Sequence, residues 1–278
     1  MAKKGSGMQK SSDELRKTAM LLQEAIRGSK IVNDLDLQSL REKCQSAKPF
    51  PFICIDGMWN ESILEDVSQE VENIVEWGRE KNFIGARKKR GLSDWDKFPP
   101  QTNVFISYLN QPLVLNITEF LMNESGLISD PYLEGGGVHS TGDGGFLKLH
   151  ADFNWHKKLN LYRRINVLVY LNKYWKKEYG GQIELAGKND KGEFTSQIAL
   201  EPTFNRTLIF ITDDHSYHGQ PNPVKTNSNM RRNSIAAYYY QSNKPEGTAK
   251  RKRTGTNYVD ETGKKLRRGL ISKIFSKP

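Results

Sequence analysis

The chain has 278 residues, of which 36% are hydrophobic and 27% are charged, with 12 Phe, 11 Tyr and 5 Trp. This composition provides enough apolar material for one packed main domain and excludes a globally disordered chain. The formal charge of +10 is concentrated at the C-terminus, where Lys244–Pro278 holds eleven basic and three acidic residues. Because residues 1–243 are nearly neutral, the charge describes a terminal segment and not a nucleic-acid-binding face of the body.

The sequence also indicates a compartment. Its two cysteines, Cys44 and Cys54, are too few for a disulfide framework, which favours a reducing environment. The first residues lack the apolar run of a signal peptide, and no stretch approaches the roughly 18 apolar residues that a membrane span needs. We therefore expect a cytoplasmic protein without a transmembrane segment.

Helical periods dominate the first part of the chain. Ser11 and Glu14 fit a capping box at the start of a helix that ends at Gly28. Apolar residues at helical spacing predict three more helices, and an apolar run predicts a strand: helices near 37–44, 60–75 and 110–121, and a strand at 52–55. Residues 85–102 mix charges with Trp95 and a pair of prolines, which predicts a long exposed loop.

From Gly135 onward the pattern changes to short β-rich runs separated by Gly, Pro and Asn. We place strands near 146–151, 165–171, 181–186, 195–200, 207–212 and 232–240. Several short strands with turns between them indicate a sandwich or jelly roll. We therefore expect an α+β fold with helices packed on the sheet. The expected organisation is a helical segment at 1–48, the main domain at 49–243 and a basic tail at 244–278.

Three side chains predict a metal site. His150 and Asp152 stand two positions apart in GFLKLHADF, which has the pattern of a strand, so both project from one face. His218 follows the apolar strand TLIFIT, and a closed β fold can return it to the first pair. Two imidazoles and one carboxylate, with open positions beside them, form the facial triad of iron(II) oxygenases. His215 is an alternative ligand, but the tight turn that follows His218 favours His218.

A basic residue near the end of the β-rich region predicts an anion site. The segment RRNSIAAYYY alternates small and large residues like a barrel strand, so Arg232 and Ser234 share one face while Arg231 faces the other way. A guanidinium matches a carboxylate with two parallel hydrogen bonds, and a neighbouring hydroxyl can donate another. We therefore expect Arg232 and Ser234 to bind a carboxylate.

Six segments follow one another in a familiar order: GGFLKLHADF, RRINVLVYLN, GGQIEL, TLIFIT, SYHGQPNPV and RRNSIAAYYY. In this combination, residues 130–241 resemble the prolyl 4-hydroxylase-like branch of the 2-oxoglutarate- and iron(II)-dependent oxygenases. The resemblance implies a double-stranded β-helix (jelly-roll) core, iron ligation by the three residues named above, and binding of the co-substrate carboxylate by Arg232. Tyr170 is similar to a tyrosine that helps hold that carboxylate, and it fits a purely structural aromatic residue equally well.

One spacing departs from the family pattern. Fourteen positions separate His218 from Arg232, which is longer than in many relatives, so Lys225 is a lesser candidate for the anchor. The resemblance implies Fe(II), 2-oxoglutarate and O2 as cofactor and co-substrates, and it leaves ascorbate open as an additional reductant. The implied reaction decarboxylates 2-oxoglutarate to succinate and CO2 and hydroxylates a C–H bond. Because Asp152 is present where halogenating relatives carry a small residue, hydroxylation is expected and halogenation is not.

The substrate stays open between two kinds. The resemblance to prolyl hydroxylases favours a proline or other residue of a protein or peptide, and a free amino acid or biosynthetic intermediate is the alternative. An open groove beside residues 85–102 would indicate a peptide, whereas a closed pocket under 153–164 would indicate a metabolite. In the second segment, Trp155, His156 and Tyr162 are candidates for substrate contact, and a solvated loop is equally compatible.

The C-terminal segment contains KRKR at 250–253, KKLRR at 264–268 and LISKIF at 270–275, which fit a basic amphipathic helix. Nucleic acid, an anionic membrane or an acidic protein could bind such a segment. A solubilising tail, or one docked on its own body, fits the same residues. A third functional hypothesis follows, in which a non-catalytic β-barrel module is attached to nucleic acid by its tail.

Overall fold

The computed structural model describes residues 11–266 with the exception of 190, 227–228 and 245–254. These residues form α1 (Ser12–Gly28), α2 (Leu37–Ser46), α3 (Glu61–Glu72), α4 (Pro100–Leu109) and α5 (Pro112–Met122), with short 3-10 helices at Trp95–Lys97 and Lys177–Tyr179. The strands are β1 (Phe52–Asp56), β2 (Arg79–Phe83), β3 (Ala86–Leu92), β4 (Ile128–Ser129), β5 (Gly137–Ala151), β6 (Trp155–His156), β7 (Leu161–Tyr170), β8 (Ile183–Lys188), β9 (Phe194–Leu200), β10 (Arg206–Ile211), β11 (Tyr217–Gln220), β12 (Arg232–Gln241) and β13 (Asn257–Tyr258).

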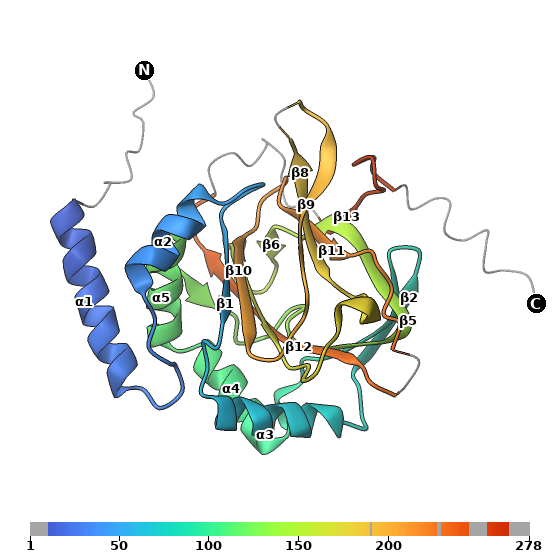
Figure 1. Ribbon diagram of the computed structural model, residues 1–278, viewed down its shortest axis with the longest axis horizontal. Coiled ribbons are helices and arrows are strands. Elements are labelled where there is room, and N and C mark those ends of the chain that lie inside the picture. The colour runs from blue at the N-terminus through green and yellow to red at the C-terminus, as the bar shows by residue number, and fades with distance from the viewer. Residues whose placement is uncertain (1–10, 190, 227–228, 245–254, 267–278) are drawn as a thin grey trace, which may run out of the picture.

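The strands form one largely antiparallel sheet that curls on itself (Figure 1). Along its main path the order is β1-β10-β7-β12-β5-β11-β8-β9, and the remaining strands pair at the sides of this path. The long strand β5 joins the two halves, because its first residues pair with β12 and its last residues pair with β11. Two facing walls therefore enclose a concave interior. The predicted α+β fold with a jelly-roll core is confirmed.

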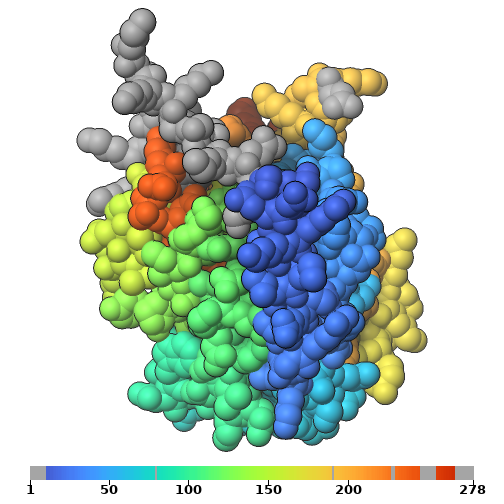
Figure 2. All heavy atoms as spheres, turned by 90° about the vertical axis from the view of Figure 1, so that its left-hand side faces the viewer, coloured from blue at the N-terminus to red at the C-terminus, as the bar shows by residue number. Residues whose placement is uncertain are grey.

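The helices cover the outer face of the wall that contains β1 and β10 (Figure 1). Helices α2 and α5 contact β1 and β10 respectively, and α1 lies against α5 at the surface, where Figure 2 shows it lengthwise. Leu22 and Ile26 of α1 belong to the same buried cluster as Ile209 of β10. The N-terminal helices thus pack on the sheet, as expected. The domain boundary at residue 48 stays a prediction.

Local signals set the ends of several helices. Ser11 accepts a hydrogen bond of 3.2 Å from the Glu14 amide, and the Glu14 carboxylate accepts one of 2.8 Å from the Ser11 amide, so the predicted capping box is present. Asn60 caps α3 by accepting from the Ile63 amide at 3.3 Å. Pro112 occupies the first turn of α5, where the amide proton that proline lacks would have no helical partner.

The prediction of an exposed loop over residues 85–102 is wrong. Ala86–Leu92 forms β3, which pairs with both β2 and β5, and α4 begins at Pro100 and buries Phe105 and Ile106. The strand sequence ARKKRGL carries four adjacent basic residues and lacks the apolar alternation that marks most strands. Hairpins at the side of a sheet tolerate such charges because one of their faces meets water.

Part of the C-terminal segment lies on the jelly roll. Asn257 and Tyr258 form β13, which pairs with β5 and places Tyr258 opposite His150. The KRKR run and most of the predicted amphipathic helix lie outside the described residues, and the domain boundary at 244 stays a prediction. Within the described ranges, no helix combines the length and the apolar character needed to span a bilayer.

Candidate metal and co-substrate site

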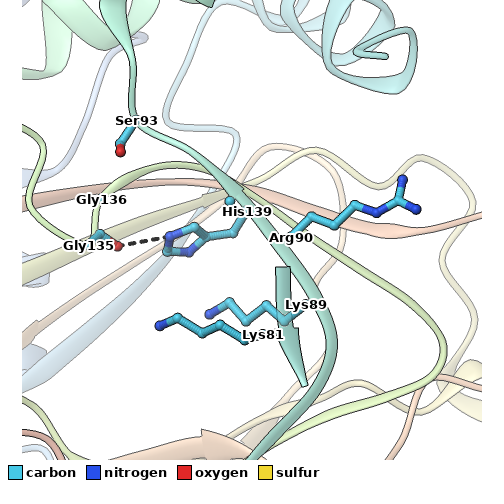
Figure 3. Close-up of a pocket in the computed structure, with 8 residues that line it drawn as sticks. Lys81, Lys89, Arg90, Ser93, Gly135, Gly136 and His139 are labelled. Carbon is cyan, nitrogen blue, oxygen red and sulfur yellow. Dashed lines mark hydrogen bonds between the residues drawn. The ribbon is translucent and has the colours of Figure 1, made fainter. Parts of the chain in front are cut away.

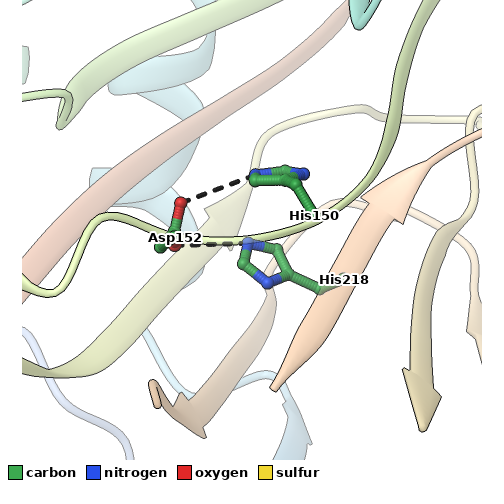
Figure 4. A group of neighbouring side chains, drawn as sticks. All are labelled: His150, Asp152 and His218. Atoms are coloured by element: carbon green, nitrogen blue, oxygen red, sulfur yellow. Dashed lines mark ion pairs between the residues drawn. The ribbon is translucent and has the colours of Figure 1, made fainter. Parts of the chain in front are cut away.

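The predicted triad converges in the concave interior. His150 is the second-last residue of β5, and Asp152 directly follows that strand. His218 lies on β11, directly opposite His150. The Nε2 atoms of His150 and His218 lie 3.5 and 3.4 Å from the two carboxylate oxygens of Asp152 (Figure 4). One donor atom from each residue lies within 4.8 Å of the other two. This geometry fits three ligands on one side of a single ion.

Both imidazoles are oriented for metal binding. Nδ1 of His150 donates to the Lys148 carbonyl at 2.8 Å, and Nδ1 of His218 donates to the Ser216 carbonyl at 3.2 Å. With the proton on Nδ1, the lone pair of each Nε2 faces the carboxylate and is available to a cation. Burial lowers the pKa of His218 to about 3, so its ring stays neutral at physiological pH. The donor set therefore fits Fe(II).

Asp152 is held by two residues that the sequence reading missed. Its Oδ2 forms an ion pair with Arg163 Nη2 at 2.8 Å and accepts a hydrogen bond of 2.8 Å from Asn166 Nδ2. Burial opposes the charged carboxylate, but Arg163 and His218 outweigh it and hold the pKa of Asp152 well below its usual range. The Arg163 guanidinium lies 3.4 Å from the ring centroid of Tyr238. Asp152 thus keeps its charge and a single orientation.

The two imidazoles also have aromatic neighbours. Tyr258 stacks on His150 with the ring centroids 5.1 Å apart, and Phe210 meets His218 edge-on at 4.7 Å. These contacts limit ring rotation and reduce the access of water to the back of the site. Tyr258 comes from the C-terminal segment, so a residue far from the triad in sequence completes its surroundings.

Arg232 is buried at 7% exposure on the same concave face. Its Nε donates to the Gly181 carbonyl at 2.6 Å and its Nη2 to the Tyr170 hydroxyl at 3.4 Å. Ser234 lies directly opposite Tyr170 in the pairing of β12 with β7. Burial raises the pKa of Tyr170, so the phenol stays protonated and can donate onward to a carboxylate. The structure therefore brings Arg232, Tyr170 and Ser234 together.

The competing candidates lie elsewhere. Lys225, the lesser candidate for the anchor, is exposed. His215 is also exposed, and it does not belong to the cluster of potential metal ligands found among the described residues. Arg231 donates from Nε to the Ser140 hydroxyl at 2.7 Å, on the face of β12 opposite Arg232. This arrangement follows the alternation expected of a strand.

His156, one of the candidates for substrate contact, is buried and makes its contacts within the fold. Its ring is fully buried, with Nε2 3.2 Å from Asp130 and 3.4 Å from Glu134, and its Nδ1 accepts a hydrogen bond from the Leu159 amide. Because Nδ1 is the acceptor, Nε2 carries the proton in the neutral ring, and it lies near the two carboxylates without a hydrogen bond to either. His156 therefore ties the segment after β5 to the loop before it.

The other aromatic candidates are partly accounted for by packing. Trp155 and Tyr162 pack edge-on with their ring centroids 4.8 Å apart. Trp175 is buried, and its indole donates to the Gly180 carbonyl at 3.1 Å. All three side chains therefore make packing or hydrogen-bond contacts within the fold.

A jelly roll that presents two imidazoles, one carboxylate and a buried arginine to one interior defines the class of non-haem iron(II) oxygenases. Residues 136–240 match the family described as the 2OG-Fe(II) oxygenase superfamily. Residues 136–240 therefore form a 2-oxoglutarate- and iron(II)-dependent oxygenase domain of this superfamily, and the metal and co-substrate site lies within them. No curated protein sequence matches the chain.

Solved structures share the fold. A prolyl hydroxylase from Trichoplax adhaerens, in complex with a hypoxia inducible factor peptide fragment, is 18% identical, with a TM-score of 0.53 over 84% of this chain and 94% of its own. A Pseudomonas putida prolyl-4-hydroxylase is 14% identical, with a TM-score of 0.51 over 73% and 98%. The epimerase SnoN, in complex with Fe3+, alpha ketoglutarate and nogalamycin RO, is 14% identical, with a TM-score of 0.52 over 85% and 98%. At these identities the likeness concerns the fold alone.

Proposed function

We propose that the protein hydroxylates a C–H bond of a protein or peptide, with proline as the first candidate residue. The main support for this proposal is that His150, Asp152 and His218 converge beside the buried Arg232. When bound, Fe(II) with 2-oxoglutarate and O2 supplies the oxidising power for hydroxylation. The carboxylate of Asp152 occupies the position that halogenating relatives leave open, which supports hydroxylation.

Each of the chain's own groups has a role in this proposal. The Nε2 atoms and the Asp152 carboxylate hold the ion on one side and leave its other side for ligands. Arg232 binds a carboxylate of 2-oxoglutarate, and the hydroxyls of Tyr170 and Ser234 add hydrogen bonds to it. Arg163 and Asn166 keep Asp152 charged and fixed, so the site is organised before the co-substrate arrives.

The shape around the site supports a peptide substrate. The segment 153–164 folds against the sheet through β6 and the buried His156, so it does not form a separate lid over the interior. A pocket instead lies beside β3, lined by Lys89, Gly91, Ser93 and the glycines at 135 and 136 (Figure 3). This pocket lies beside the 85–102 segment, on the side where the groove of a peptide substrate is expected.

The test measures succinate formed from 2-oxoglutarate in the presence and absence of Fe(II). Release that requires Fe(II) and disappears in Asp152→Ala supports the oxygenase, and mass spectrometry then searches peptides and metabolites for the gain of one oxygen. If only metabolites gain an oxygen, the substrate is a small molecule and not a protein or peptide. Absence of succinate release, with nucleic-acid retention that depends on the basic tail, would indicate the non-catalytic module instead.

Three further properties belong to this proposal. A cytoplasmic location is proposed because two cysteines are too few for a disulfide framework. The tail is proposed to contact an acidic partner or nucleic acid because of its excess of basic residues. Ascorbate is proposed as an additional reductant. Activity with and without ascorbate, and binding of tail variants in which lysines are replaced by glutamine, test the last two.

A further inference from the structure

Two lysines of the β2–β3 hairpin share a cross-strand row with the co-substrate anchor. Lys81 lies opposite Lys89, Lys89 lies opposite Thr141 of β5, and Thr141 lies opposite Arg232 of β12. Directly opposite residues in antiparallel strands project from the same face of the sheet. The two lysines therefore face the concave interior together with Arg232.

These lysines line a pocket. Figure 3 shows the side chains of Lys81 and Lys89 running side by side in one direction, with His139 above them and the glycines at 135 and 136 opposite. Arg90, the next residue of β3, also lines the pocket, but its guanidinium points the other way and lies 3.7 Å from Glu80. Alternation along the strand thus points the side chains of neighbouring basic residues in opposite directions.

The far wall of the pocket is held in place. Nε2 of His139 bonds to the Gly135 carbonyl at 2.9 Å, and the Tyr238 hydroxyl donates to the same carbonyl at 3.1 Å. At Gly136 a Cβ would lie 2.9 Å from the Ala236 carbonyl oxygen, so the backbone is packed closely against β12. The lysines therefore face a wall of fixed shape, as in a binding pocket and unlike an open surface.

The electrostatic surroundings of Lys89 are mostly positive. Burial and the charges of Lys81, Arg232 and Arg163 lower its pKa to about 7, and the carboxylate of Asp152 is the group that opposes them. Asp152 already pairs with Arg163 at 2.8 Å. A dicarboxylate held by Arg232 would compensate the charge of that arginine, and the positive surroundings of Lys89 would still favour an anion in the pocket.

We propose that this pocket binds an anionic group of the substrate, a carboxylate or a phosphate, and so selects substrates that carry such a group near the hydroxylated carbon. The inference rests on the proposed function, since it assigns the group to the substrate of the same site. For a peptide, the anionic group is an acidic or phosphorylated residue close to the modified residue. The two lysines act as specificity residues.

The first experiment tests the anion site itself. The protein is loaded with Mn(II) and 2-oxoglutarate without O2, and inorganic phosphate is the probe, observed by phosphorus NMR. Phosphate bound beside Lys89 lies near the paramagnetic ion and relaxes faster than free phosphate. The enhancement should fall at least about tenfold in Lys89→Met and Lys81→Met, as expected when a charged hydrogen-bonding partner is lost. It should persist in Lys89→Arg and in the matched control Arg90→Met.

The second experiment tests the assignment to substrate. Three fluorescent peptides share a central proline and differ beside it in one residue, which is glutamate, phosphoserine or glutamine. The glutamate and phosphoserine peptides should bind about tenfold or more tightly than the glutamine peptide, with the difference lost in Lys89→Met and reduced by salt. If the glutamate peptide binds more tightly, the preferred ligand is a carboxylate. If the phosphoserine peptide binds more tightly, it is a phosphate.

The outcomes separate this inference from the proposed function. Binding is measured with and without Mn(II) and 2-oxoglutarate, so the pocket is tested even if no succinate is ever formed. Phosphate relaxation that is absent, or equal in wild type and Lys89→Met, overturns the anion site. Equal affinity for the three peptides, including no affinity for any, overturns its assignment to the substrate.

Discussion

His150 and His218 are direct cross-strand partners in the antiparallel pairing of β5 with β11, and their ring centroids lie 4.5 Å apart. One strand pairing therefore sets the distance between the two imidazoles. Asp152, two residues after His150, completes the triad from the same chain segment. A slip of one residue in this pairing would turn one ring out of the interior, so the site depends directly on register.

Gly219 tests this dependence. A Cβ at this position would lie 2.8 Å from the Leu147 carbonyl oxygen and from backbone atoms of Lys148, so Gly219→Ala must move β11 away from β5. We expect a loss of about 1–3 kcal/mol in the free energy of unfolding and a metal affinity at least about tenfold weaker, because His218 moves with the strand. Denaturation and Mn(II) titration measure both. Gly28→Ala, which meets no atom within 4 Å, is the control: it should keep the wild-type metal affinity and should not lower the free energy of unfolding.

Replacing Arg163 should weaken metal binding without removing a ligand. In Arg163→Met the buried carboxylate of Asp152 loses its ion pair, which costs about 3–5 kcal/mol of folding free energy and about 10- to 100-fold in metal affinity. Arg164→Met removes the neighbouring arginine, which pairs with Glu124 at 2.6 Å. That control should keep the wild-type metal affinity, and equal losses in both variants would contradict a role for Arg163 at the metal.

Arg232→Met should weaken the binding of 2-oxoglutarate. Loss of a charge-assisted pair costs about 1.5–3 kcal/mol, so the dissociation constant of 2-oxoglutarate should rise roughly 10- to 100-fold while the Mn(II) affinity is kept. Tyr170→Phe should show a smaller rise, because one neutral hydrogen bond is lost. Arg231→Met removes the adjacent arginine on the outer face and should bind 2-oxoglutarate normally. Anaerobic titration gives the three constants.

The stack between Tyr258 and His150 predicts a role for the C-terminal segment. Tyr258→Ala should lower metal affinity by about 2- to 10-fold, in line with about 0.5–1.5 kcal/mol for an aromatic pair. Burial raises the pKa of Tyr258 to about 12, so the phenol is neutral at working pH and the ring itself supplies the contact. Tyr258→Phe should therefore retain the wild-type affinity. A phenylalanine variant as weak as the alanine variant would argue against stacking.

Stability of the metal-free protein should fall in acid. Since burial lowers the pKa of His218 from 6.5 to about 3, the unfolded chain holds one more proton on this residue between these values. The free energy of unfolding then decreases as the pH drops through this range, by up to about 1.4 kcal/mol per pH unit. Asp152, whose pKa is held well below its usual range, adds a decrease in the same direction below about pH 4.

Chemical denaturation between pH 7.5 and pH 4.5 measures this dependence. His218→Gln keeps a polar side chain of similar size without a group that titrates in the range, so its slope should be shallower than that of wild type. Identical slopes in the variant and in wild type would exclude His218 as the cause of the pH-dependent loss of stability. The comparison is made without metal, because a bound ion excludes the proton from Nε2.

Several features of the site could be read from local patterns. The pair His150 and Asp152 shares a face because side chains alternate along a strand, and the same rule separates Arg232 from Arg231. The capping box at Ser11 and the stripe on α3 likewise depend on residues within one turn of each other. These features involve short separations along the chain, where backbone geometry alone decides which side chains meet.

Other features depend on irregular backbone. Arg163 and Asn166 are three residues apart, and on a regular strand they would face opposite sides. The register of β7 against β12 shifts between Tyr239 and Tyr240, which pair with Ile165 and Arg163. This bulge turns Arg163 toward Asp152. Alternation alone assigns it to the wrong face, so the sequence reading missed it.

By itself, the amino-acid sequence determined which segments form most of the helices and strands, on which face of a regular strand each side chain lies, and the chemistry of the triad. Only the tertiary structure decided that the basic run of β3 is a strand beside the site, that His156 is buried, and that Tyr258 lies on His150. The physical reason is the range of the interactions. Alternation and capping act between near neighbours, whereas strand pairing joins residues many tens of positions apart and depends on how the whole sheet closes.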